Sequence, residues 1–138
     1  MRPKRILLVE DEALVALAAE DALLDAGYVV VGPADRLESA LFLAESEELD
    51  AAVLDVNLAG VYVWPVADAL DARSVPFVLL TGFGKGLDLP PSCQRHPVIA
   101  KPLKPQDLLV ALKAQLARAR SASRPAFPDR QSEGVAQS

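Results

Sequence analysis

Short apolar runs recur along the chain, separated by longer segments in which apolar residues return every three or four positions. A short run with almost no polar interruption is typical of a strand buried on both faces of a sheet. The predicted strands cover residues 5–9, 28–32, 51–55, 77–81 and 96–100. Pro33 follows the second run directly and is expected to end that strand.

The segments after the first two strands predict helices. The first helix is expected to end at Gly27, and the second to begin at Asp35, where Glu38 three residues later completes a capping-box pattern. The residues expected to face the sheet are Leu14, Leu17, Ala18, Leu23 and Leu24 in the first helix and Leu37, Ala40, Leu41 and Ala44 in the second.

A third helix is predicted over roughly residues 62–73, with Pro65 in its first turn. Pro105 opens the last helix, in which Leu108, Leu109, Leu112 and Leu116 are expected to face inward. Between the fourth and fifth strands, the stretch GFGKGLDLPPS contains Gly and Pro residues where a helical pattern would be expected. We therefore predict a short or irregular fourth helix.

Regular alternation of strand and helix predicts an α/β fold with a central parallel sheet, helices on both faces and right-handed connections. The expected form is a flavodoxin-like (βα)5 domain with a five-stranded parallel sheet in the order 2-1-3-4-5. Ligands of such sheets bind at the carboxyl ends of the strands. Polar residues at those ends are therefore the first candidates for a functional site.

A chain of 138 residues with 51% hydrophobic and 24% charged residues suits one globular domain, expected over residues 1–120. Residues 121–138 hold Ser, Arg, Gln and Pro without apolar periodicity, which predicts a disordered tail. With no further domain expected after residue 120, we predict output by protein contact.

The formal net charge of −5 argues against a nucleic-acid partner that relies on phosphate attraction. No stretch approaches the roughly 18 apolar residues of a membrane span, and the N-terminus does not resemble a signal peptide. The single Cys93 has no partner within the chain, which fits a cytoplasmic protein. His96, the only histidine, lacks companions at zinc-ligand spacing and is expected at the surface or at a strand edge.

Three adjacent acids, Glu10, Asp11 and Glu12, interrupt the apolar segment LLVEDEALVAL at the end of the first predicted strand. Neighbouring carboxylates repel one another unless water or a cation compensates them. Asp55 ends the third strand, which lies beside the first in the predicted order, so these acids should converge. A hard cation such as Mg²⁺ prefers carboxylate and carbonyl oxygens, and the sequence therefore predicts a metal site.

A hydroxyl and an ammonium group are expected at the same edge, because Thr81 ends the fourth strand and Lys101 follows the fifth. With the acidic pair, VLDVN around Asp55, LLTG around Thr81 and IAKP around Lys101, the chain resembles the receiver domains of two-component response regulators over about residues 4–118. The resemblance implies that Asp55 is phosphorylated by a histidine kinase or a histidine phosphotransfer protein.

The family pattern also implies the role of each site residue. Asp11 and Asp55 would bind Mg²⁺ directly, with the main-chain carbonyl of Asn57 as a further ligand and Glu10 acting directly or through water. Lys101 would balance charge opposite the metal, and its peptide bond to Pro102 is expected to be cis. Thr81 would donate a hydrogen bond to the phosphoryl oxygens.

The stretch PFVLLTGFG resembles the signature of the FATGUY-type single-domain receivers. Ordinary receivers carry an aromatic switch residue three positions before the lysine, where this chain has Val98. We therefore predict that Phe83, two residues after Thr81, acts with Thr81 as the switch.

Three other functions remain open. The chain could be a phosphate sink, a pseudo-receiver that only binds proteins, or a haloacid-dehalogenase-like phosphatase. The phosphatase motif requires a second acid two residues after the nucleophile, where this chain has Asn57. A receiver is not a turnover enzyme, since it catalyses only its own phosphorylation and slow dephosphorylation. Its expected partners are the phosphodonor and a downstream protein effector, with neither nucleic acid nor membrane.

Overall fold

The computed structural model describes residues 2–82 and 88–123. Its helices and strands follow one another in the predicted alternation. The elements are β1 (Arg5–Val9), α1 (Ala13–Asp25), β2 (Val29–Ala34), α2 (Leu37–Ser46), β3 (Ala51–Asp55), β4 (Asn57–Leu58), β5 (Val61–Tyr62), α3 (Trp64–Ala72), β6 (Phe77–Thr81), the 3₁₀ turn η1 (Pro91–Cys93), β7 (Val98–Ala100) and α4 (Pro105–Ser123).

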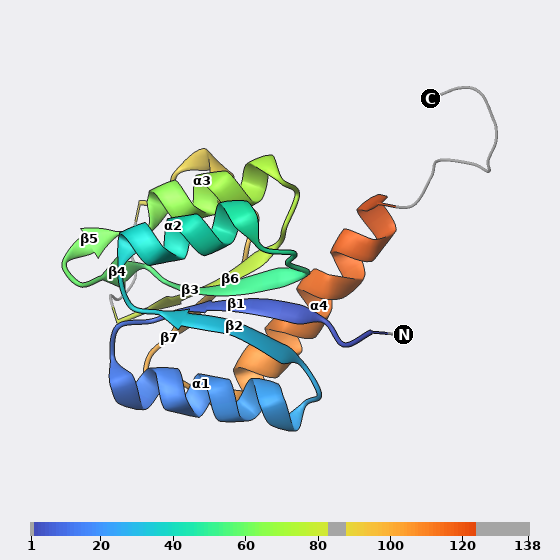
Figure 1. Cartoon of the computed structure of the whole chain (residues 1–138), viewed down its shortest axis with the longest axis horizontal. Coiled ribbons are helices and arrows are strands. Elements are labelled where there is room, and N and C mark those ends of the chain that lie inside the picture. The colour runs from blue at the N-terminus through green and yellow to red at the C-terminus, as the bar shows by residue number, and fades with distance from the viewer. Residues whose placement is uncertain (1, 83–87, 124–138) are drawn as a thin grey trace.

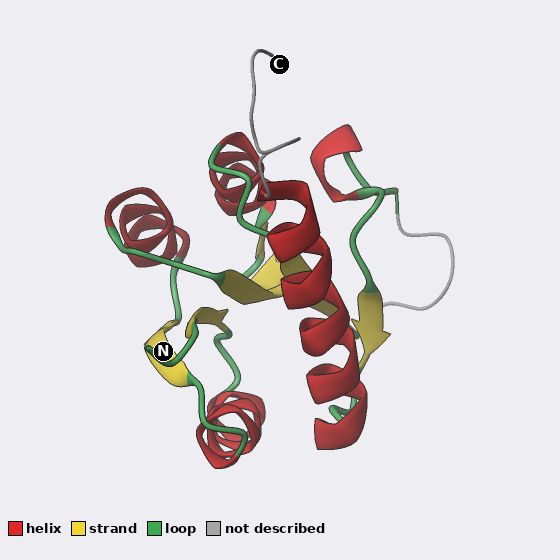
Figure 2. Ribbon diagram, turned by 90° about the vertical axis from the view of Figure 1, so that its right-hand side faces the viewer, coloured by secondary structure: helices red, strands yellow, loops and turns green. Residues whose placement is uncertain are grey.

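Five parallel strands form the central sheet in the order β2-β1-β3-β6-β7 (Figure 1). With β4 and β5 left out of the count, this is the predicted order 2-1-3-4-5. Helices α2 and α3 cover one face, and α1 and α4 cover the other, so the sheet lies between two helical layers in Figure 2. The predicted flavodoxin-like fold is therefore confirmed.

Side chains alternate between the two faces along each central strand, as the pleat requires. In β1, Leu7 and Val9 pack under α2 and α3, whereas Ile6 and Leu8 pack under α1 and α4. These four residues are fully buried. The near-continuous apolar runs of the sequence thus arise because both faces of the sheet are covered.

The predicted end of the second strand is wrong, because β2 continues through Pro33 to Ala34. The β1–β2 register shifts between Leu7 and Val9, where Gly32 has a φ of +100°. This bulge and the position of β2 at the sheet edge let the strand accommodate a proline, which has no N–H to donate. Pairing then resumes where the Glu10 N–H donates to the Ala34 carbonyl at 3.0 Å.

The predicted inward face of α1 is also largely wrong. Leu23 is buried as expected, but Leu14, Leu17 and Leu24 are exposed, with Leu14 81% accessible. The buried face consists of Leu23 and three alanines, Ala16, Ala19 and Ala22. Small alanine side chains let the helix lie close to the sheet, and the larger leucines consequently point outward.

Further boundaries differ from the predicted ones. Helix α2 begins at Leu37 with Arg36 as its N-cap and no side-chain capping hydrogen bond, so the capping box predicted at Asp35 is wrong. Helix α3 begins at Trp64, not near residue 62, because Tyr62 pairs with Asn57 in the small β4–β5 hairpin. Strand β7 starts at Val98, two residues later than predicted. Pro65 lies in the first turn of α3 as expected.

Between β6 and β7, the regular structure within described residues 88–97 is limited to the turn η1, which agrees with the prediction of a short fourth helix. Helix α4 extends to Ser123, three residues past the predicted domain boundary. The rest of the predicted tail, from residue 124, lies outside the described residues. Among the described helices, none is both long and apolar enough to cross a bilayer.

Candidate functional site

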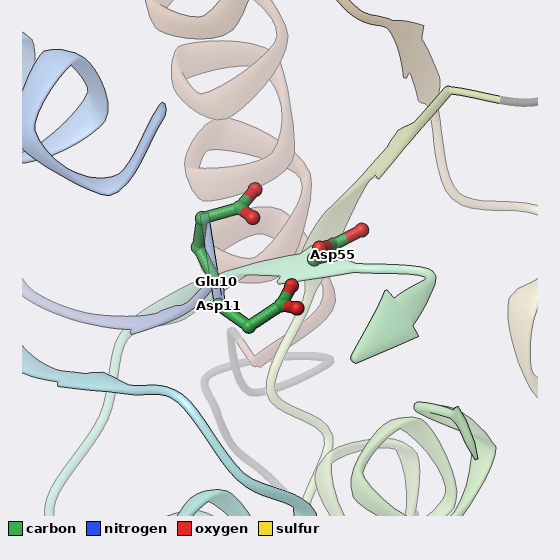
Figure 3. Close-up of side chains that lie close together, drawn as sticks. All are labelled: Glu10, Asp11 and Asp55. Atoms are coloured by element: carbon green, nitrogen blue, oxygen red, sulfur yellow. The ribbon is translucent and has the colours of Figure 1, made fainter. Parts of the chain in front are cut away.

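Three carboxylates meet at the carboxyl ends of β1 and β3 (Figure 3). Glu10 and Asp11 follow β1, and Asp55 is the last residue of β3. The two strands are neighbours with Val9 opposite Leu54, so the next residues along each chain emerge side by side. One oxygen from each of the three acids lies within 4.8 Å of the others. The convergence predicted from the sequence is therefore present.

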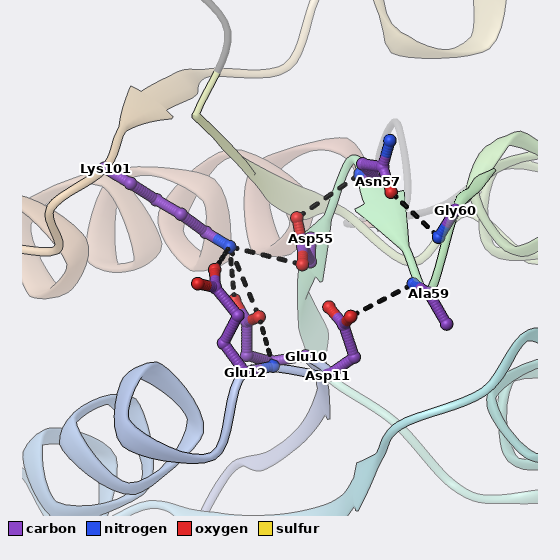
Figure 4. Close-up of polar contacts among 8 residues, drawn as sticks. All are labelled: Glu10, Asp11, Glu12, Asp55, Asn57, Ala59, Gly60 and Lys101. Carbon is purple, nitrogen blue, oxygen red and sulfur yellow. Dashed lines mark hydrogen bonds and ion pairs between the residues drawn. The ribbon is translucent and has the colours of Figure 1, made fainter.

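Lys101 reaches into this cluster from the end of β7 (Figure 4). Its Nζ lies 3.2 Å from Asp55 Oδ2, 3.1 Å from Glu10 Oε1 and 2.6 Å from Glu12 Oε1. The main chain fixes its approach, because the Lys101 N–H donates to the Thr81 carbonyl at 2.8 Å. The bond between Lys101 and Pro102 is cis, as predicted.

The turn after β3 is tied to the acids through main-chain N–H groups. The Ala59 N–H donates to Asp11 Oδ2 at 3.1 Å, and the Asn57 N–H donates to Asp55 Oδ1 at 3.3 Å. Within the turn, the Asn57 side-chain oxygen accepts a hydrogen bond from the Gly60 N–H at 3.0 Å. The β4–β5 hairpin is thereby held next to Asp11 and Asp55.

The environment raises the pKa of both Asp55 and Lys101, which favours the neutral form of Asp55 and the charged form of Lys101. Burial raises the pKa of Asp55 to about 8, and its hydrogen bonds with Glu10 and Asp11 and the charge of Glu10 add to the effect. Burial alone would lower the pKa of Lys101, but hydrogen bonds to Glu12 and Glu10 and the charge of Asp55 outweigh it and raise the pKa. Lys101 is therefore firmly cationic beside a carboxyl group that resists ionisation.

Asp11 behaves differently from Asp55 although the two are close. Its partial burial acts to raise the pKa, but hydrogen bonds with Asp55 and the Ala59 N–H, together with the charge of Lys101, lower it below the usual value. Asp11 is also exposed, whereas Glu10 and Asp55 are buried. The cluster thus offers an accessible, ionised carboxylate at its mouth.

A cavity of about 370 Å³ opens above these groups, lined by Asp11, Glu12, Asp55, Asn57, Gly82 and Lys101. Thr81 is buried at the end of β6, in register with Ala100 of β7. The other predicted switch residue, Phe83, lies outside the described residues. Apart from Phe83, the residues predicted for the site therefore gather at one edge of the sheet.

The donor set fits a hard divalent cation. Carboxylate oxygens are the ligands that such ions prefer, and three of them converge here. Glu10 Oε1 is buried and accepts no hydrogen bond among the described residues, although the Lys101 ammonium is 3.1 Å away. A cation would satisfy this oxygen and reduce the repulsion among the acids.

The sequence pattern predicted roles for Glu10 and Asp11 but not the contact between Glu12 and Lys101. Lys101 Nζ contacts Glu10, Glu12 and Asp55, and its contact with Glu12 is the shortest of these. The main-chain donor of Ala59 to Asp11 was missed as well. Glu12 directly follows two acids, so its position in the sequence could have indicated a role at the site. A main-chain hydrogen bond cannot be predicted from the pattern of side chains.

Comparison with known proteins defines the class. The transcriptional regulatory protein PdtaR of Mycobacterium tuberculosis is 32% identical over 128 residues, covering 86% of this chain and 59% of PdtaR. The solution structure of SdrG from Sphingomonas melonis Fr1 is 40% identical with a TM-score of 0.72, covering 84% of this chain and 98% of SdrG. No family model matches the chain.

Two other solved structures are described as receiver domains. The receiver domain of the sensor histidine kinase PA1611 from Pseudomonas aeruginosa PAO1 is 26% identical with a TM-score of 0.71, covering 83% of this chain and 98% of that one. It holds a magnesium ion coordinated in its active site cleft. A CheY-like receiver domain protein from Methanospirillum hungatei JF-1, 24% identical with a TM-score of 0.73, covers 88% of this chain and 99% of that one and shares the fold.

This chain, with its parallel five-stranded sheet and an acidic cluster facing a lysine, has the CheY-like fold. This chain belongs to the response regulator receiver domains of two-component systems. It spans 59% of the length of PdtaR and 34% of the length of the transcriptional activator IrlR from Burkholderia pseudomallei.

Proposed function

We propose that this receiver domain accepts a phosphoryl group on Asp55 from a histidine kinase or a histidine phosphotransfer protein, in a Mg²⁺-dependent reaction. The observation that carries the proposal is the position of Asp55. It is a buried strand-end carboxylate with the Lys101 ammonium at 3.2 Å and two further acids beside it. This arrangement suits a nucleophile whose negatively charged product requires neutralisation.

In the proposed reaction, a carboxylate oxygen of Asp55 attacks the phosphorus of a phosphohistidine. A phosphorus–oxygen bond forms, the phosphorus–nitrogen bond breaks, and the imidazole leaves and takes up a proton. The Lys101 ammonium lies 3.2 Å from Asp55 Oδ2 and can donate to a phosphoryl oxygen bound there. Thr81 ends β6, the strand beside β3. Phosphoryl transfer depends mainly on positioning and charge neutralisation, and these groups surround the oxygen atoms of Asp55.

Asp11, Asp55 and the main-chain carbonyl of Asn57 would hold the Mg²⁺ ion, with Glu10 binding it directly or through water. The ion would supply positive charge that keeps Asp55 ionised and neutralises the phosphoryl oxygens. Support comes from the convergent carboxylates of this chain and from the magnesium ion in the PA1611 receiver domain.

We propose further that the phosphorylated domain signals through protein contacts and does not turn over a substrate. Exposed apolar side chains support protein contacts, among them Leu14 and Leu17 on α1, the helix that begins at the site. PdtaR is named as a transcriptional regulatory protein and IrlR as a transcriptional activator protein, whereas for this chain we predict no nucleic-acid partner.

The test is phosphotransfer from the histidine kinases and phosphotransfer proteins of the source organism, each labelled on its histidine. We expect a subset of donors to transfer label to the wild-type chain within minutes and none to label the Asp55→Asn variant. A wild-type chain that takes no label from any donor, or an Asp55→Asn variant that does, would contradict the proposal.

A further inference from the structure

The Lys101 ammonium group has as many acidic partners as it has hydrogen atoms to donate. An ammonium carries three N–H groups. Its Nζ donates to Glu12 Oε1 at 2.6 Å and to Glu10 Oε2 at 3.2 Å, and it pairs with Asp55 Oδ2 at 3.2 Å. All three acids lie within hydrogen-bonding or ion-pair distance of Nζ, so a new acceptor competes with contacts that Lys101 already makes.

The three acids differ in what that release would cost. The Glu10 and Asp55 side chains are 0% and 4% accessible, whereas the Glu12 side chain is 59% accessible. A buried carboxyl group that loses its hydrogen-bonding or ionic partner is left unpaired away from water, whether charged or neutral, which is costly. An exposed carboxylate is rehydrated at once. Glu12 is therefore the partner that Lys101 releases most easily.

Glu12 also stands where an incoming phosphoryl group would arrive. It lines the cavity above Asp55 together with Lys101. Its main-chain N–H donates to Glu10 Oε2 at 3.0 Å, which fixes its position at the start of α1. The Glu12 side chain makes no capping hydrogen bond to that helix. Its carboxylate is thus directed to Lys101 and not to the helix end.

We propose that Glu12 is a positioning residue that holds the third N–H of Lys101 in the unphosphorylated state and competes with the phosphoryl group for it. This inference rests on the proposed function of Asp55. Glu12 therefore sets how readily Asp55 is modified, by acting on Lys101 and not on the phosphoryl group itself. Removing its contact frees one donor of Lys101 for the phosphoryl oxygens.

Two substitutions separate the contact from the charge. Glu12→Gln removes the charge with little change in shape. Glu12→Asp keeps the charge at the mouth of the cavity but shortens the side chain by one methylene, so the carboxylate loses the 2.6 Å contact with Lys101 Nζ. The matched control is Glu45→Gln on α2, an exposed glutamate for which the same charge change occurs away from Lys101.

The experiment is a titration of the full chain with beryllofluoride, a phosphoryl mimic, at saturating Mg²⁺. Because an exposed ion pair is weak, we expect Glu12→Gln and Glu12→Asp each to bind about two- to fivefold more tightly than wild type, and Glu45→Gln to bind as wild type does. The inference is overturned if neither Glu12 variant differs from wild type. It is also overturned if Glu12→Asp behaves as wild type while Glu12→Gln gains, or if Glu45→Gln gains equally, because charge alone then accounts for the effect. A wild-type chain that binds no beryllofluoride would overturn the proposed function of Asp55 itself.

Discussion

Asp55 Oδ2 lies 3.2 Å from the ammonium nitrogen of Lys101, yet burial and the neighbouring acids raise the pKa of Asp55 to about 8. One cation is therefore insufficient to keep this buried carboxylate ionised beside Glu10 and Asp11 at neutral pH. The native state without metal binds a proton at Asp55 that an unfolded chain, with an aspartate pKa of 3.8, releases at much lower pH.

The first prediction concerns stability without metal. Because the pKa of Asp55 is raised in the folded state, its ionisation opposes folding, and this penalty grows as pH rises from about 4 toward 8. In EDTA at pH 8, we expect Asp55→Asn to unfold with about 1–3 kcal/mol more free energy than wild type. The gain should shrink at pH 6 in urea denaturation. Equal stability of the two proteins at pH 8 would show that Asp55 is not destabilised as described.

A second prediction separates metal binding from folding at Asp11. Asp11→Asn removes a charged ligand but keeps a side-chain oxygen that can accept the Ala59 N–H. We expect Mg²⁺ affinity to fall at least about tenfold, measured by calorimetry. Without metal, the unfolding free energy should change by less than about 1 kcal/mol, since Asp11 is exposed. Unchanged Mg²⁺ affinity would remove Asp11 from the ligand set.

The third prediction concerns His96, which the sequence assigned to the surface or a strand edge. Its ring is half-buried, stacked on Phe77 with centroids 3.9 Å apart, and its Nδ1 lies 2.6 Å from Gln115 Nε2. The same Gln115 nitrogen donates to the Phe77 carbonyl at 2.7 Å, so it is a donor and His96 Nδ1 must accept. His96 is therefore neutral, with its proton on Nε2.

Burial lowers the pKa of His96, and the charges of Arg95 and Arg118 act in the same direction against that of Asp71. His96 therefore favours folding above the unfolded pKa of 6.5, and this contribution is lost as pH falls below it. As His96 is the only histidine, its ring C–H resonances report this directly in an NMR titration. We expect a midpoint below 6.5, shifted toward 6.5 in Gln115→Ala. A wild-type midpoint at or above 6.5 would contradict the geometry.

A fourth prediction tests the bulge in β2. A Cβ at Gly32 would lie 2.8 Å from the Leu8 carbonyl oxygen and from the Ala34 nitrogen, and the φ of +100° is itself unfavourable for alanine. Gly27 has a similar φ of +90° but open space around it, which makes Gly27→Ala the matched control. We expect Gly27→Ala to cost about 1 kcal/mol and Gly32→Ala at least about 1 kcal/mol more, by urea denaturation. Equal losses would mean that the close contacts at Gly32 do not matter.

Much of this architecture could be predicted because strand ends follow directly from apolar runs. Asp55 and Lys101 each stand at the end of such a run, and the parallel strand order brings them together. The inward face of α1 could not be predicted in the same way. Leucine and alanine alternate around that helix, and periodicity alone does not show that the sheet contacts the alanine side.

The path of β2 through Pro33 depends on a register shift against β1 that no local pattern encodes. The partnership of Glu12 with Lys101 depends on how an exposed side chain folds back over the site. Both features arise from tertiary contacts between segments distant in sequence. Spacing and composition therefore identified the chemical groups of the site but not all of their partners.

Acetyl phosphate labelling of the full chain, followed by mass spectrometry of intact protein and of its peptides, tests the central claim most directly. We expect one phosphoryl group per chain, on Asp55, formed only when Mg²⁺ is present and abolished by Asp55→Asn. Glu45→Gln, an exposed acid outside the site, should be labelled as wild type is. Labelling without Mg²⁺, or labelling that persists in Asp55→Asn, would contradict the assignment of Asp55 as the phosphoacceptor of this receiver domain.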